Sequence, residues 1–216
     1  MPAHGQVELK PGLRVGFNSA SFAGDTDEFI DGIADELSRR LSGSGVSGEV
    51  TDGRRSGFTA GGFLIVDFAG PFALQPELRY IQRGYTFDTE LTNGFQTETV
   101  ESTLRFDYID IAALARYDIP VSGFTPHLIA GPTLGFNVNA ETEAEGAGTS
   151  TTNDLSDDTN GTDFGLELGA GAEFGLGEVA LTVDGRVGVG ISDVFNENDN
   201  ITLRNNSLML TAGIVF

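Results

Sequence analysis

The sequence predicts an all-β fold in which eight antiparallel strands run up and down and close into a barrel. Eight segments alternate apolar and polar residues with a period of two, which places successive side chains on opposite faces of a strand. The connections between these segments alternate strictly between short and long, as in a barrel that carries only tight turns at one end. No apolar run approaches the roughly 18 residues of a transmembrane helix.

The order of the elements follows from this pattern. The strands are expected at residues 9–18, 58–68, 72–80, 109–117, 124–136, 164–174, 179–191 and 208–216. The short turns are residues 69–71, 118–123 and 175–178, and the long loops are residues 20–57, 88–101, 140–162 and 193–202. Residues 7–216 would then form one barrel domain.

The first residues suggest processing. Ala3-His4-Gly5 has the small-x-small pattern of a signal-peptidase site. Residues 1–6 are therefore interpreted as the remnant of a signal peptide, with a disordered N-terminus as the alternative.

Aromatic residues begin and end the apolar faces of the strands, which indicates a face turned to lipid. Phe58 and Phe68 are ten residues apart on one strand. At about 3.3 Å per residue and a tilt near 40°, they differ in height by about 25 Å, which is the height of the apolar band of an outer-membrane barrel. The residues predicted to form the two aromatic girdles are Phe17, Phe58, Phe68, Phe72, Tyr117, Phe124, Phe136, Phe164, Phe174 and Phe216. The apolar set therefore faces outward, and a transmembrane barrel is favoured over a soluble, lipocalin-like one.

The polar faces carry acids and bases in balance. Buried charges must be paired, and the lumen of an eight-stranded barrel is only just wide enough for its own side chains. Glycine falls mostly in the polar phase, which leaves room for the charged side chains. The predicted lumen network is Arg14, Asp67, Glu77, Arg79, Asp110, Arg116, Glu167, Glu173, Asp184 and Arg186. A plugged interior is expected, and an open channel is not.

The net charge of −20 excludes nucleic-acid binding, which needs a basic surface. Most of the 32 acidic residues lie in the long loops, whose bases are Arg39, Arg40, Arg54 and Arg55. The long-loop end is thus strongly anionic. The chain has no cysteine, so thiolate metal sites and disulfides are excluded.

The first long loop is expected to contain a short amphipathic helix. Phe29, Ile30, Ile33, Leu37 and Leu41 recur at helical spacing. Asp25 with Glu28 would form a capping box at its start, and Gly43 would end it. Such a helix would cap the barrel mouth, lie on lipopolysaccharide, meet a partner or only pack its own loop.

Two motifs partly match known chemical sites, and neither match is favoured. Ser156, Asp158 and Asn160 with Glu167 partly match a calcium loop, but the first ligand and the flanking helices of that motif are missing, so an acidic solvated loop is favoured. His127 falls in the polar phase near the short turns, whereas a lipid A deacylase needs a Ser–His pair on the lipid face. His127 is therefore expected to be an interior, hydrogen-bonding histidine. The protein is expected to be no enzyme and to hold no cofactor or resident metal.

Several strand motifs resemble the PorT-like outer-membrane barrel family of Bacteroidota and relatives, which are eight-stranded barrels similar to OmpA and OmpX. They include Gly57-Phe-Thr-Ala-Gly-Gly-Phe63, Phe72-Ala-Leu-Gln-Pro-Glu-Leu-Arg-Tyr80, His127-Leu-Ile-Ala-Gly-Pro-Thr133 and Asp184-Gly-Arg-Val-Gly-Val-Gly190. The family often has proline where Ala112 stands. The resemblance implies a non-catalytic barrel, a terminal Phe216 read by the barrel-assembly machinery and, for one member, a role in a gliding-type secretion system.

The sequence thus leads us to expect a non-enzymatic barrel of a Gram-negative outer membrane that presents acidic extracellular loops for a structural or interaction role, with periplasmic termini. A component of a secretion or envelope assembly machine is the alternative, and a narrow channel a weaker one. The expected partners are outer-membrane lipid and lipopolysaccharide, the barrel-assembly machinery and a protein at the extracellular loops.

Overall fold

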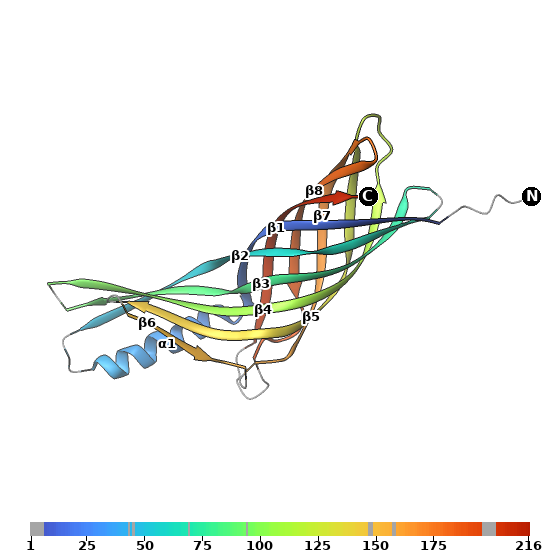
Figure 1. Cartoon of the computed structure of the whole chain (residues 1–216). Helices are drawn as coiled ribbons and strands as arrows, with labels where there is room; N and C mark the ends of the chain where they lie inside the picture. The colour runs from blue at the N-terminus through green and yellow to red at the C-terminus, as the bar shows by residue number, and fades with distance from the viewer. Residues whose placement is uncertain are drawn as a thin grey trace, which may run out of the picture.

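A computed structural model describes residues 7–42, 44, 46–68, 70–93, 95–146, 149–156, 159–195 and 202–216. Its strands form one antiparallel sheet in the order β4-β3-β2-β1-β9-β8-β7-β5-β6, and an additional pairing of β4 with β5 closes the ring (Figure 1). Eight strands make the ring, and β6 lies outside it, paired with β5. The predicted eight-stranded up-and-down barrel is therefore confirmed. The interpretation of residues 1–6 lies outside the described residues.

The strands are β1 (Glu8–Gly24), β2 (Ser47–Asp67), β3 (Phe72–Thr92), β4 (Thr97–Asp118), β5 (Thr125–Gly146), β6 (Thr149–Asp154), β7 (Thr162–Leu176), β8 (Val179–Gly190) and β9 (Leu203–Val215). The single helix of the described residues, α1 (Thr26–Leu41), lies between β1 and β2. Among the described residues, no helix is both long enough and apolar enough to cross a membrane.

The short turns lie together at one end of the barrel, each with a glycine in the left-handed region. Gly70, Gly123 and Gly177 have φ angles of 105°, 97° and 82°, which L-residues with a side chain rarely adopt. Both ends of the described chain lie at this same end, because the start of β1 pairs with the end of β2 and with the end of β9. We call it the short-turn end, and the opposite one the long-loop end.

The outer surface of the ring is apolar. All ten residues of the predicted aromatic girdles are between 38% and 60% exposed on this surface. Three aromatic pairs join neighbouring strands: Phe58 with Tyr80, Phe72 with Tyr117, and Phe124 with Phe174, with ring centroids 5.4, 5.1 and 5.7 Å apart. Leucine, valine and isoleucine side chains occupy the outer surface between the two aromatic rows.

Four strands are much longer than the apolar pattern predicts. β3 and β4 pair from Phe72–Tyr117 as far as Thr92–Thr97, so most of the expected loop 88–101 is a β-hairpin. β5 continues to Gly146 and pairs with β6 inside the expected loop 140–162. The reason is that beyond the apolar band both faces of these strands meet water, so threonine and glutamate replace the apolar residues and the alternation disappears.

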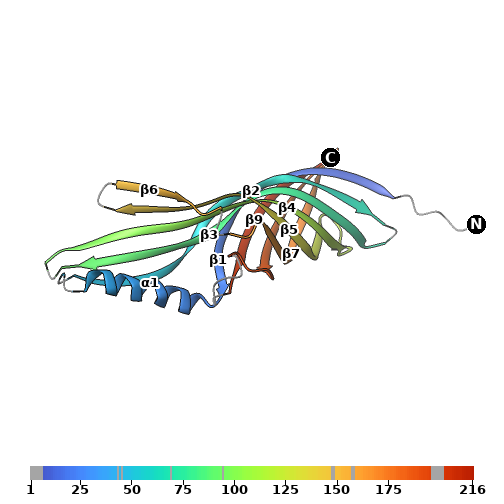
Figure 2. The same cartoon turned by 90° about the horizontal axis from the view of Figure 1, so that it is seen from below.

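The extended parts of β2–β5, together with β6, form a projecting sheet at the long-loop end (Figure 2). We define this projecting sheet as residues 47–54, 85–92, 97–105, 140–146 and 149–154. Helix α1 packs on β2, one edge of the sheet, with Leu37 and Leu41 over Gly48. β6 forms the other edge.

Helix α1 confirms the predicted helix in the first long connection, but the predicted capping box is wrong. Asp25 is the N-cap and makes no side-chain cap hydrogen bond. Its carboxylate instead accepts a hydrogen bond from the backbone N–H of Thr202 at 3.0 Å, which ties the helix start to the loop before β9. The expected stop at Gly43 lies outside the described residues. In the last turns, the hydrogen bond from Arg40 and the charges of Arg39 and Arg40 lower the pKa of Glu36.

The apolar outer surface leads to a first prediction. Leu168 and Leu176 of β7 are 61% and 64% exposed, but Leu168 lies between the aromatic rows and Leu176 beyond Phe174 near a short turn. In lipid vesicles, Leu168→Arg should lower the free energy of unfolding by about 2–4 kcal/mol, because the charge enters hydrocarbon, and Leu176→Arg by about 1 kcal/mol or less. Denaturant titration measures both, and equal losses would contradict a lipid-facing band at this height.

Candidate functional site in the lumen and the projecting sheet

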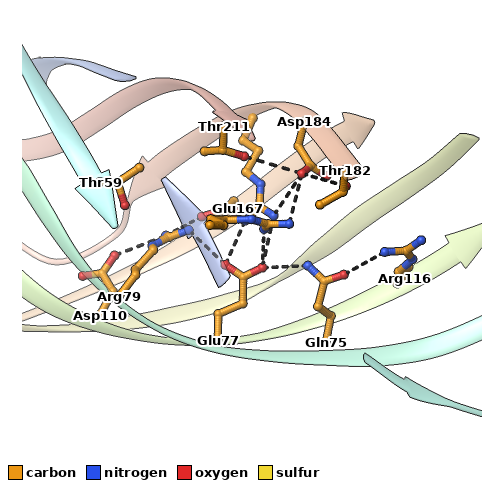
Figure 3. Close-up of polar contacts among 12 residues, drawn as sticks. Thr59, Gln75, Glu77, Arg79, Asp110, Arg116, Glu167, Thr182, Asp184 and Thr211 are labelled. Carbon is orange, nitrogen blue, oxygen red and sulfur yellow. Dashed lines mark hydrogen bonds and ion pairs between the residues drawn. The ribbon is translucent and has the colours of Figure 1, made fainter. Parts of the chain in front are cut away.

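The lumen is built around Glu77, a carboxylate on β3 that is only 4% exposed. Arg14 of β1 donates from Nη1 to Glu77 Oε1 at 2.6 Å, and Arg186 of β8 donates from Nη1 to Oε2 at 3.0 Å. Gln75 Nε2 donates to Oε1 at 2.7 Å. Figure 3 shows Glu77 within this network, with Gln75 joined to its carboxylate by a dashed line. One carboxylate thus links the two sides of the barrel.

The network continues toward the long-loop end through alternating charges. Glu167 of β7 accepts from Arg186 at 2.7 Å and from Arg79 at 2.5 Å. Asp110 of β4 accepts from Arg79 at 3.2 Å and from Arg83 at 2.6 Å. Arg83 also reaches Asp163 at 3.3 Å. Each buried charge therefore contacts charges of the opposite sign, as the low dielectric of the lumen requires.

Toward the short-turn end the network passes through Asp184 of β8. Arg14 donates to Asp184 Oδ2 at 3.0 Å, and His127 Nε2 lies 2.7 Å from Asp184 Oδ1. A Cβ on Gly171 would stand 2.6 Å from Asp184 Oδ1 and 2.7 Å from His127 Nε2. Only glycine leaves room for this close pair, which shows how glycine in the polar phase shapes the lumen.

Arg116 of β4 joins the residues of the lumen network that lie nearest to the short turns. Its Nε donates to Asp118 at 2.7 Å, its Nη2 to Glu173 at 2.9 Å and its Nη1 to Gln75 at 3.3 Å. Gln75 therefore connects Arg116 to Glu77.

Nine of the ten residues that the sequence placed in the lumen network belong to this connected set. Asp67 does not: it pairs with Lys10 at 2.7 Å, and its side chain is 24% exposed. Its place at the end of β2, next to a short turn, leaves it within reach of water.

The predicted list omits Arg83, Asp163, Gln75 and His127, which the structure brings into the network. Arg83 and Gln75 are in phase with Glu77 and Arg79 on β3, so the period of two identifies them. Asp163 falls between the predicted loop 140–162 and the predicted strand that starts at Phe164, yet it lies in β7 and is in phase with Glu167. The sequence predicts that His127 faces the interior, but its contact with Asp184 of β8 depends on strand pairing.

The packed lumen leaves little free space. A small cavity with room for about one water molecule lies among Arg83, Asp163 and Asn205. Arg79, Asp110, Glu167 and Arg186 fill the cross-section beside it and are all at most 4% exposed. In the part of the chain that the structure describes, the lumen is filled by paired side chains.

A hydrophobic layer covers this charged interior at the long-loop end. Phe22 stacks on Tyr85 with ring centroids 5.2 Å apart, and Phe106 meets Phe195 edge-on at 6.1 Å. Phe29 of α1 stacks on Phe195 at 6.5 Å. The N-terminal end of α1 therefore helps to close the barrel mouth. Burial in this layer raises the pKa of Tyr85.

The outer face of the projecting sheet is acidic. Asp88, Glu101 and Glu145 stand directly opposite one another on β3, β4 and β5. Arg105 pairs with Glu143 on the same face. The described residues contain no group of three or more side chains arranged to hold a metal ion.

The residues of the partial calcium motif lie apart. Asn160 donates from Nδ2 to the backbone oxygens of Asp193 and Phe195. Glu167 points into the lumen, bound to Arg79 and Arg186. Asp158 lies outside the described residues. The geometry of the described residues therefore gives the motif no calcium-loop arrangement.

The lumen network leads to a second prediction. Glu77→Leu should lower the free energy of unfolding by about 3–5 kcal/mol, because Arg14 and Arg186 each lose a buried partner. Asp67→Asn, which breaks the more exposed pair with Lys10, should cost about 1 kcal/mol or less. Denaturant titration in lipid vesicles compares the two, and similar losses would show that the buried pairs are not required for the barrel.

Comparisons with known proteins agree with this architecture. No curated protein sequence matches the chain. Among solved structures, the chain is similar to surface protein A (NspA) of Neisseria, at 14% identity, 97% coverage of each chain and a TM-score of 0.51, which supports the fold alone. Ail of Yersinia pestis (13% identity, coverage of 97% of this chain and 99% of Ail, TM-score 0.43) and OprG of Pseudomonas aeruginosa (11%, 98% of each chain, 0.44) are also similar.

The match to a family decides the classification. The outer membrane protein beta-barrel domain family matches residues 5–196, which is most of the chain. The match includes the strands β1 to β8 and the charged residues that those strands contribute to the lumen. With its closed eight-stranded ring, apolar outer surface and filled lumen, the chain belongs to the outer membrane protein beta-barrel domain family.

Proposed function

We propose that this chain is a non-enzymatic outer-membrane barrel that holds a rigid acidic sheet outside the cell as a surface for binding a partner. The observation that carries the proposal is the continuity of β2–β5. Each of these strands continues from the filled barrel into the projecting sheet, with register shifts near the junction between β2 and β3 and between β4 and β5. A surface built this way is far more rigid than a loop, so a partner would bind it at a smaller entropic cost.

The proposal includes an orientation. Residues 7–216 form one domain, the short-turn end and the termini face the periplasm, and the projecting sheet faces outward, as short periplasmic turns and long outer extensions do in bacterial barrels. The lipid-facing band contacts outer-membrane lipid and lipopolysaccharide. We propose the barrel-assembly machinery as a partner that recognises Phe216.

A second candidate function is a component of a secretion or envelope assembly machine. The strand motifs that resemble the PorT-like family favour it, because one member of that family serves in such a machine. Under this reading the chain would be recovered in a fixed stoichiometry with other envelope proteins. The pairing of the lumen carboxylates with arginines and the small free volume of the lumen favour a barrel without catalysis or transport.

Cross-linking tests the binding surface directly. Lys10 is the only lysine, so amine-directed reagents cannot report on the projecting sheet. A zero-length carbodiimide reagent, which joins carboxylates to a partner's amines, should give cross-links from Asp88, Glu101 or Glu145 in native membranes. The control is Asp88→Asn with Glu101→Gln and Glu145→Gln, which should abolish them. A barrel recovered without partners, or partners joined only at the short-turn end, would refute the surface and favour the assembly component.

Conductance tests the filled lumen. In planar lipid bilayers the wild-type barrel should give no discrete channel openings, because paired side chains occupy its cross-section. A sixteen-stranded porin, whose barrel encloses an aqueous channel, supplies the positive control. Reproducible single-channel steps from the wild type would contradict the filled lumen and favour the narrow-channel alternative.

A further inference from the structure

The described residues at the end of the β3–β4 hairpin are hydrogen-bonded to one another. The strands stay in register up to Thr92 and Thr97, whose hydroxyls lie 2.9 Å apart. Asn93 donates its backbone N–H to Gln96 O at 3.1 Å, and its side-chain Oδ1 accepts from the N–H groups of Phe95 and Gln96 at 3.2 and 2.9 Å. The hydrogen bonds of Asn93 therefore fix the backbone of Phe95 and Gln96.

Phe95 itself is 99% exposed. It is far from the lipid-facing band: from Tyr80, in the aromatic row, to Thr92 the strand covers about 40 Å at about 3.3 Å per residue. Both views place the hairpin end at the outermost part of the projecting sheet (Figures 1 and 2). The ring contributes nothing to the core, so its apolar surface is free to contact another molecule.

The surroundings of Phe95 are acidic. Residues 47–53 and 86–103 contain Glu49, Asp52, Asp88, Glu90, Glu98 and Glu101 and no lysine or arginine. Glu49 stands opposite Glu90, and Asp88 opposite Glu101, although like charges in these positions weaken a sheet. On the neighbouring helix, Arg39 and Arg40 already pair with Glu36. The hairpin therefore presents one apolar ring within a negative field.

We infer that the tip of the β3–β4 hairpin is a protein-binding site, at which Phe95 enters an apolar pocket of a partner whose surrounding surface is basic. Aromatic side chains in central pockets dominate many interfaces, and complementary charges at the rim raise the association rate. The carboxylates around the ring would repel an anionic lipid surface, so a second membrane fits this site poorly. The inference rests on the proposed binding function and names its contact point and the chemistry of the partner.

Random twelve-residue peptides displayed on phage, selected against the barrel in nanodiscs, provide the probe. The selected peptides should combine an apolar residue with several lysines or arginines. Phe95→Ala should weaken their binding at least tenfold, as expected for a buried aromatic anchor, whereas Phe95→Tyr should keep most of it. Gln96→Ala, a neighbouring exposed side chain, is the matched control and should change affinity less than twofold. Raising the salt concentration should weaken binding to wild type and to Phe95→Ala alike.

Three results of the peptide experiment would overturn the inference. They are peptides that bind Phe95→Ala as tightly as wild type, a selection that yields no basic peptides, and Phe95-dependent binding to phosphatidylglycerol–phosphatidylethanolamine vesicles in place of peptides. The test is separate from the carbodiimide experiment. Carboxylate cross-links that persist in Phe95→Ala would refute the anchor while leaving the binding sheet in place.

Discussion

The ion pairs of Glu77 with Arg14 and Arg186 are the interaction on which the rest of the barrel depends. A ring of eight strands forces every second side chain into a space that the side chains themselves must fill. Three strands far apart in the chain, β1, β3 and β8, place charged groups at the same height in this space. Pairing there offsets the high desolvation cost of charges in a dry interior. It also links opposite walls of the ring.

The same closure explains the outer surface. Once the polar residues turn inward, the alternate residues of every strand face outward, and leucine, valine and phenylalanine form a continuous apolar band. In water this band would be a large exposed patch that favours aggregation, whereas in a membrane it is solvated by lipid. The interior charges and the exterior apolar band are thus two consequences of one alternation, divided by the sheet.

Beyond the band the constraint changes, because both faces of the strands meet water. The projecting sheet does not close into a ring, so it has two open edges. Helix α1 covers the β2 side, and β6 ends the sheet on the other side with a short polar strand, which limits the length of open edge. The hydrophobic layer of Phe22, Phe106 and Phe195 separates this water-exposed region from the charged lumen.

The alternation along the chain, together with the order of short and long connections, was sufficient to predict the ring, the outward direction of the apolar set and the helix after β1. These features depend on local periodicity, which a single sequence records. The pairing of His127 with Asp184, the membership of Asp163 and the exclusion of Asp67 from the connected network needed the register of strands distant in sequence. The length of β2–β5 beyond the band also needed the tertiary structure, because polar residues on both faces carry no periodic signal, and only hydrogen bonding to neighbouring strands decides whether such a segment is a loop or a sheet.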